Sequence, residues 1–230
     1  HVTFGVFDVA DYGAPQHRLR FVMLGSRDFP PPAMPEASHG LGKQPFSTVR
    51  EAIAHLAHAP GPHSEYTPAV RRFFELVPPG CNWRALPREI QREALGGAYE
   101  SGGGKTGFYR RLAWDAPSPT ITGRANRKGS AICHPDATRP LSVLECAALQ
   151  GFPADWRLHG AMNSQYMQVG NAVPVHLGMA IGRALAAHER AVAAREMGAD
   201  WKPDMEMMMA SAIGRLRAAG RNKRSVQQAA

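Results

Sequence analysis

Glycine and proline recur so often along this chain that long uninterrupted helices and strands are not expected. The 230 residues include 23 Gly and 19 Pro, roughly 18% of the chain, against about 12% for these two residues in average proteins. They cluster at 30–32, 78–80 and 102–104, where they should end regular structure. We therefore expect short elements joined by many turns, in one generous domain or two small ones.

Composition narrows the class of protein. No apolar run approaches the ~18 residues of a membrane span, and residues 1–10 lack the charged head and apolar middle of a signal peptide, so we expect a soluble, cytoplasmic protein. Three widely spaced cysteines, Cys81, Cys133 and Cys146, predict neither a disulfide framework nor a metal site. The net charge of +8 favours a polyanionic partner, with a merely basic surface as the alternative.

Two strands are expected near the amino end. Apolar residues alternate over 2–7, and 21–24 is a second apolar run rich in strand formers. Turn-forming residues at 11–15 should connect the two. Arg18 and Arg20 stand two apart at the mouth of the second strand, so their side chains should point to the same side.

Two capping boxes predict helix starts. Thr48–Glu51 should open a short helix over 49–57, and Ser142–Glu145 a helix over 143–150.

A third helix is predicted from Asn171, which can cap it, with Pro174 in its first turn and apolar residues at helical spacing as far as His188. Its amino end would present backbone N–H groups able to hold a carboxylate or phosphate, although most capped helices hold nothing. Residues 205–216 repeat the apolar pattern and predict a further amphipathic helix docked on a neighbour.

Residues 60–140 mix basic and aromatic side chains in a region of little periodicity. This mixture suits nucleic-acid contact, because Arg and Lys meet phosphates and bases. A solvated small domain whose aromatic residues form its core explains the pattern equally well. On the first interpretation, the candidate DNA contacts are Lys105, Arg110, Arg111, Arg124 and Arg127.

Three ordered segments carry a resemblance to a known family. Residues 11–20 resemble the eighth motif of DNA (cytosine-5) methyltransferases, with its Gln-x-Arg-x-Arg core. Residues 139–153 are similar to the ninth motif and residues 168–174 to the tenth, and their order and separations also match. The resemblance covers about residues 1–195 and corresponds to the carboxy-terminal part of the family.

The resemblance implies an α/β fold in which the chain is the end of a Rossmann-like, S-adenosylmethionine-dependent methyltransferase domain plus a smaller, loop-rich target-recognition domain. The last strands would occupy residues 1–45 and the recognition domain, with the ninth motif, residues 46–162. A helix returning to the catalytic domain would occupy residues 163–198, and a basic amphipathic tail residues 199–230.

The resemblance also implies roles for individual residues. Such enzymes transfer a methyl group from S-adenosylmethionine to carbon 5 of a cytosine flipped out of double-stranded DNA, and in bacteria they would work at the nucleoid. Arg20 would contact the flipped base, with Arg18 and Gln16 helping to place the base and the catalytic loop. The residues beside the cofactor would be Asn171, Ala172 and Val173.

The chain departs from the family pattern in two ways. Leu144 stands where the ninth motif usually carries Arg, which puts one structural ion pair or hydrogen bond in doubt. The Pro-Cys nucleophile, the Glu-Asn-Val acid and the glycine-rich cofactor turn do not occur. We therefore expect either the end of a truncated enzyme or the second subunit of a split one, inactive alone. The competing classes are a non-catalytic DNA-binding or regulatory subunit and a nonspecific basic nucleic-acid binder.

Overall fold

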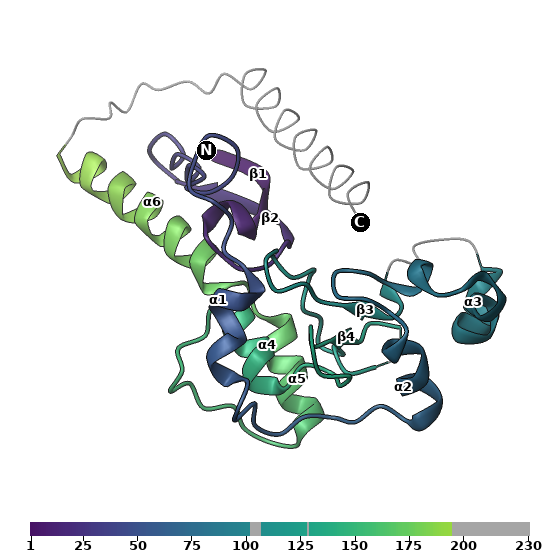
Figure 1. Cartoon of the computed structure of the whole chain (residues 1–230). Coiled ribbons are helices and arrows are strands. Elements are labelled where there is room, and N and C mark those ends of the chain that lie inside the picture. Colours follow the sequence, from purple (N-terminus) through teal and green to yellow (C-terminus); the bar gives the residue numbers. More distant parts are fainter. Residues whose placement is uncertain (102–106, 128, 195–230) are drawn as a thin grey trace. The chain divides into compact units, whose positions relative to one another are not determined.

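The computed structural model describes residues 1–101, 107–127 and 129–194, which fall into two compact units. The hairpin unit comprises His1–Phe46 and, among the described residues, 174–194, and the central unit comprises Ser47–Val173. Figure 1 shows the elements of both units. Within the described ranges, no helix combines the length and apolar character needed to cross a membrane.

A two-stranded antiparallel sheet opens the hairpin unit (Figure 1). β1 (Val2–Asp8) pairs with β2 (Leu19–Gly25) so that the first residue of β1 lies opposite the last residue of β2. The short 3-10 helix η1 (Val9–Tyr12) follows β1 directly. Both predicted strands are confirmed, and β2 begins two residues earlier than its apolar run because pairing with β1 extends it.

The helix α6 (Val175–Ala193) packs against η1. Its fully buried Leu177 joins a small core with side chains of β1, η1 and the following turn: Phe7, Val9, Tyr12 and Ala14. The sheet and α6 are therefore held together where the strands are connected.

The predicted start of this helix is wrong. Asn171 does not cap α6 but is the last residue of another helix, α5 (Met162–Asn171), which no apolar pattern predicted. Where the resemblance implies one helix over 163–198, the described part of this segment holds two. Ala172 has an extended backbone, and α6 begins only at Val175, after Pro174. A proline disfavours helical conformation in the residue before it, which explains the break.

The central unit contains short elements and many turns. Both capping boxes are confirmed, with side-chain and backbone bonds in each direction. The capped helices are shorter than expected: α1 (Val49–Ile53), continued by η2 (Ala54–Leu56), and α4 (Val143–Leu149). The other elements are α2 (Pro68–Glu75), η3 (Trp83–Ala85), α3 (Arg88–Leu95), η4 (Gly96–Tyr99) and the parallel two-residue strands β3 (Arg110–Arg111) and β4 (Ile132–Cys133).

Two apolar clusters stabilise the central unit. One joins α1, α4 and α5, and the other joins α2, α3 and the segment around β3. In the second cluster the rings of Tyr66 and Phe74 stack at 4.3 Å, and fully buried Tyr109 donates its hydroxyl hydrogen bond to Ala94 O at 3.0 Å. The aromatic residues of this region therefore form a core, as the second interpretation of its composition predicts.

The helix α5 belongs to the central unit. The Tyr166 hydroxyl donates to Leu141 O at 2.6 Å, and Gln150 Nε2 donates to Val169 O at 2.8 Å. These bonds tie α5 to α4 and to the segment before it, so the boundary that we expected after residue 162 lies after Val173. The tail at 199–230, with its predicted helix at 205–216, lies outside the described residues.

Candidate functional site

The loop between β1 and β2 is organised around one carboxylate. Asp8 Oδ1 accepts hydrogen bonds from Arg18 N at 2.9 Å and from Ala10 N at 3.3 Å. Asp8 Oδ2 lies 2.9 Å from His17 Nδ1, and an ionised carboxylate only accepts, so the imidazole is the donor. Burial opposes the ionisation of Asp8, which is 9% exposed, but these bonds hold its pKa below the ordinary value.

The three candidate catalytic residues follow this carboxylate along the chain. Gln16 is fully buried and Arg18 nearly so, whereas Arg20 is half-buried and donates from Nη1 to Leu19 O at 2.7 Å. Burial and the neighbouring charge of Arg20 lower the pKa of Arg18 to about 10. Burial also lowers the pKa of Arg20, so both guanidinium groups are partly withdrawn from water.

A second carboxylate of this loop, Asp11, is also partly buried. Burial, together with the charge of Asp8, raises the pKa of Asp11 to about 6. The Asp11 carbonyl accepts bonds from the backbone N–H groups of Ser38 and His39. Gly13, at φ +88°, lies against the His39 ring, where an added Cβ would be 2.8 Å from Cε1. The loop is thus held by hydrogen bonds at both Asp8 and Asp11. The motif did not single out Asp8, Asp11 or His17.

The candidate cofactor residues lie at the end of α5. Asn171 and Val173 are exposed and Ala172 is partly buried, so all three are accessible to a ligand. The preceding Gly170 has a different role, because a Cβ there would lie 2.1 Å from Gly123 N and 2.2 Å from Thr122 C. This glycine lets the helix backbone touch the backbone of another segment.

The ninth-motif segment is anchored by a buried ion pair. Arg139 Nη1 and Nη2 donate to the two oxygens of Glu145 at 2.8 and 2.7 Å, and Ser142 N donates to Glu145 Oε2 at 2.7 Å. The pair raises the pKa of Arg139. Leu144 is 42% exposed and takes no part in this network, while its side chain lies beside Gly61. The sequence pattern identified Glu145 only as a capping residue, because its ion-pair partner, Arg139, lies outside the four residues of the capping box.

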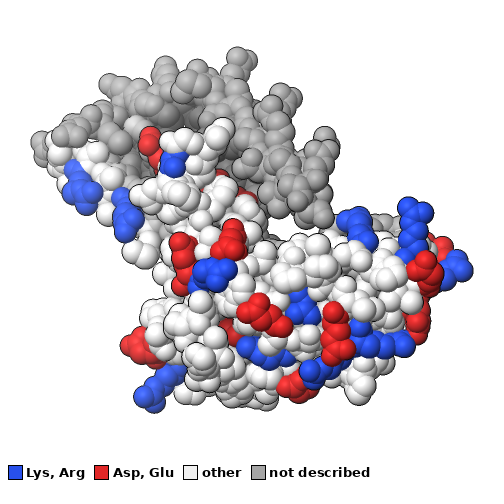
Figure 2. Space-filling view, viewed as in Figure 1, with Lys and Arg blue, Asp and Glu red and all other residues white. Residues whose placement is uncertain are grey.

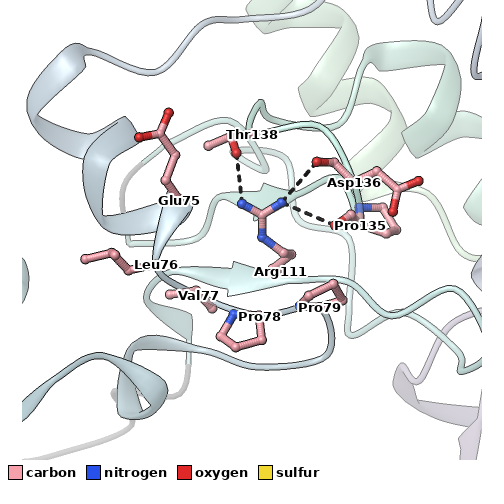
Figure 3. Close-up of a pocket in the computed structure, with 9 residues that line it drawn as sticks. All are labelled: Glu75, Leu76, Val77, Pro78, Pro79, Arg111, Pro135, Asp136 and Thr138. Atoms are coloured by element: carbon pink, nitrogen blue, oxygen red, sulfur yellow. Dashed lines mark hydrogen bonds between the residues drawn. The ribbon is translucent and has the colours of Figure 1, made fainter.

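The expectation that Arg111 contacts DNA is corrected by the structure. Arg111 is only 7% exposed and is one of the residues that line an open pocket of about 490 Å³ (Figure 3). Its guanidinium donates to Phe74 O at 2.7 Å, to Thr138 Oγ1 at 2.9 Å and to Pro135 O at 3.2 Å. Because its donors are directed at the protein itself, Arg111 stabilises the fold of the central unit.

The other basic candidates differ in exposure. Arg124 and Arg127 are exposed and share a turn, in which Arg127 N donates to Arg124 O at 3.0 Å. Arg110 is partly buried, and burial lowers its pKa. Lys105 lies outside the described residues.

Basic and acidic side chains alternate over the central unit on the face that Figure 2 shows. Exposed ion pairs account for part of this pattern: Arg50–Asp115, Arg71–Glu75, Arg72–Glu93 and Arg92–Glu100. The acidic partners partly neutralise these arginines. The positive field that a polyanion meets on this face is therefore weaker than the number of arginines suggests.

Two of the cysteines, Cys133 and Cys146, are poor nucleophiles. Cys133 and Cys146 are fully buried, and burial raises the pKa of Cys133 to about 11 and that of Cys146 well above its ordinary value. A thiol with a raised pKa is protonated at neutral pH and attacks slowly. Across the described ranges, no cluster of three or more His, Cys, Asp or Glu side chains has the arrangement of a metal site.

Comparison with known proteins gives consistent matches. Residues 1–187 match the family of C-5 cytosine-specific DNA methylases. The Type II methyltransferase M.Sau96I of Staphylococcus aureus is 36% identical over 80% of this chain, and M.Eco47II of Escherichia coli is 38% identical over 76%. In both comparisons the matched part is 43% of the relative's length.

A solved structure of the Dnmt2 methyltransferase of S. pombe aligns with 82% of this chain and 58% of its own, at a TM-score of 0.42 and 14% identity. That likeness is too loose to carry an argument, so the family assignment rests on sequence. C-5 DNA methyltransferases use S-adenosylmethionine as their methyl donor. The match over residues 1–187 and the two relatives show that the chain belongs to the C-5 cytosine-specific DNA methylase family.

Proposed function

We propose that this chain is the carboxy-terminal portion or subunit of a DNA (cytosine-5) methyltransferase. The complete enzyme would transfer a methyl group from S-adenosylmethionine to carbon 5 of a cytosine flipped out of a specific duplex sequence, at the bacterial nucleoid. The amino-terminal half, on the same or another polypeptide, would supply the nucleophilic thiolate. Two observations support this division: the chain spans about 43% of its relatives, and Cys133 and Cys146 are buried and protonated.

The observation that carries the proposal is the pair of partly desolvated guanidinium groups beside an organised loop. Carbon 5 of cytosine is too electron-poor to attack a methyl donor, so a thiolate must first add to carbon 6. Negative charge then develops on the ring toward O2 and N3. A guanidinium is suited to this place, because it keeps its charge and directs several donors in one plane. We assign this role to Arg20, with Arg18 and Gln16 supporting it.

The residues at the end of α5 fit a cofactor contact. When bound, S-adenosylmethionine supplies an activated methyl group on a sulfonium. The exposed amide of Asn171 can both donate and accept hydrogen bonds, and the exposed side chain of Val173 offers an apolar surface. We propose that Asn171, Ala172 and Val173 hold part of this cofactor.

We propose that the central unit recognises DNA and that its exposed basic turn contacts the duplex. Flipping a base costs a few kcal/mol and requires a grip on the surrounding duplex. Arg124 and Arg127 can meet phosphates or base edges from one turn, and we include Arg110 and Lys105 as further contacts. Arg111 is excluded by its burial.

The test is reconstitution. We expect the purified chain alone to transfer no methyl group to DNA, and addition of the amino-terminal half of the enzyme to restore transfer. Methylation by the chain alone would contradict the proposal. DNA binding without methylation after reconstitution would instead favour a non-catalytic DNA-binding or regulatory subunit.

A further inference from the structure

The Asp8 side chain joins the two ends of the loop that carries the candidate catalytic residues. Asp8 is the last residue of β1, and Arg18 immediately precedes β2. The backbone closes the loop with a bond from Val9 N to Arg18 O at 3.1 Å. The Asp8 carboxylate adds the bond from Arg18 N at 2.9 Å, which runs beside it in the opposite direction.

The same carboxylate also fixes the inside of the loop. Through its bond from Ala10 N it caps η1, and through Oδ2 it holds the His17 ring. The His17 ring also packs against the ring of Phe46 in a T-shaped arrangement, with the two ring centroids 5.5 Å apart. The Asp8 side chain therefore restrains Ala10, His17 and Arg18 within residues 9–18. His17 lies directly between Gln16 and Arg18 in the sequence.

We propose that Asp8 is a positioning residue for methyl transfer, because its carboxylate, together with His17, fixes the backbone from which Gln16, Arg18 and Arg20 act. The inference rests on the proposed function, in which Arg20 stabilises charge on the target base. Asp8 does not itself touch substrate in this account. It acts through the backbone N–H of Arg18, two residues before the guanidinium that does.

The physical reason is the sensitivity of catalysis to placement. A misplacement of about 1 Å at a reacting group can cost ~10²-fold in rate. A bond from a backbone N–H to a carboxylate is among the stronger hydrogen bonds in proteins, and here its acceptor, Asp8, is only 9% exposed. Loss of this acceptor leaves a buried N–H unsatisfied, so the loop must move or admit water.

Two variants separate positioning from general stability. In Asp8→Ala all three restraints are lost. In Asp8→Asn the side-chain oxygen can still accept from Ala10 N and Arg18 N, so the backbone restraint is retained while the charge is removed. Asp28→Ala is the matched control, because Asp28 is an exposed carboxylate of the same unit whose ion pair is with Arg27 on the surface.

The first readout is amide hydrogen exchange in the chain. We expect Asp8→Ala to accelerate exchange of Arg18 N–H and Ala10 N–H by about tenfold or more. The β1–β2 pairs and the central unit should keep their protection, which shows that the protein is still folded. Asp8→Asn should accelerate exchange less, and Asp28→Ala should not change it. Unchanged protection of Arg18 N–H in Asp8→Ala would overturn the proposed restraint.

The second readout is single-turnover methylation by the complete enzyme. We expect Asp8→Ala to lower the methyl-transfer rate by ~10²-fold with little change in DNA affinity, and Asp8→Asn to recover most of the rate. Equal rates in Asp8→Ala and the wild type would overturn the catalytic consequence even if exchange were faster. A wild-type enzyme without methyl transfer would refute the proposed function and this consequence with it, while the exchange measurement would still decide whether the restraint exists.

Discussion

Replacing Gly170 by alanine should destabilise the central unit, although alanine is the better helix former. Gly170 is the penultimate residue of α5. An alanine Cβ at this place would lie 2.1 Å from Gly123 N, 2.2 Å from Thr122 C and 2.5 Å from Gly123 Cα. All three are backbone atoms, so relief requires α5 to move away from this segment rather than a side chain to rotate.

The magnitude follows from two opposing effects. Overpacking costs typically ~1–3 kcal/mol, and contact with three backbone atoms places this case at the upper end. Alanine gains at most ~1 kcal/mol in helix propensity. We therefore expect a net loss of about 2 kcal/mol, which lowers the midpoint of thermal unfolding by roughly 7 °C for a unit of this size.

The assay is thermal unfolding of the variant beside a matched control. Gly178→Ala introduces the same methyl group within α6, where nothing lies within 4 Å of the new Cβ. It should raise the stability of the hairpin unit by up to ~1 kcal/mol. A Gly170→Ala protein as stable as the wild type would refute the close approach of α5 to the 122–123 segment.

Three further predictions concern the hairpin unit and DNA. Arg20→Ala should lower single-turnover methyl transfer of the complete enzyme by ~10²-fold or more and DNA affinity much less, and equal losses of both would identify an ordinary phosphate contact. Because burial raises the pKa of Asp11 to about 6, the folded state holds this proton longer than the unfolded state, so stability should fall as pH rises from about 4 to above 6. The shift of ~2 pH units corresponds to ~3 kcal/mol, which solvent screening reduces to about 1 kcal/mol for a half-buried group. Asp11→Asn should remove this fall, and parallel urea midpoints for wild type and variant across that range would contradict it. In the double variant of Arg124 and Arg127 to Ala, the slope of log K against log salt should become shallower by up to ~2, and an unchanged slope would show that this turn makes no phosphate contact.

The features that the sequence predicted correctly are those fixed by neighbouring residues. The alternation over 2–7 identified β1, and the two capping boxes identified the starts of α1 and α4. In each case the signal is short, six residues for the alternation and four for a capping box, so a short window of sequence contains it although β1 is held by its pairing with β2.

The features that were missed depend on residues far apart in the sequence. Arg111 was expected on the surface because arginine usually is, and only the fold shows that its guanidinium is surrounded by the carbonyls of Phe74 and Pro135. The helix α5 has mixed polarity, and its bonds reach the segment from Leu141 to Gln150. No local pattern indicates either partner.

Buried charged side chains are needed in this chain because it is rich in turns. Frequent Gly and Pro leave many backbone N–H and C=O groups outside helices and sheets, and each buried one requires a partner. Asp8 accepts from two backbone N–H groups, Glu145 accepts from Ser142 N, and Arg111 donates to several carbonyls. An apolar substitute at any of these positions fills the volume but leaves those backbone groups unsatisfied, at ~1–3 kcal/mol each. In this turn-rich chain, the buried charged side chains therefore hold the loops in place by bonding backbone groups that helices and sheets do not pair.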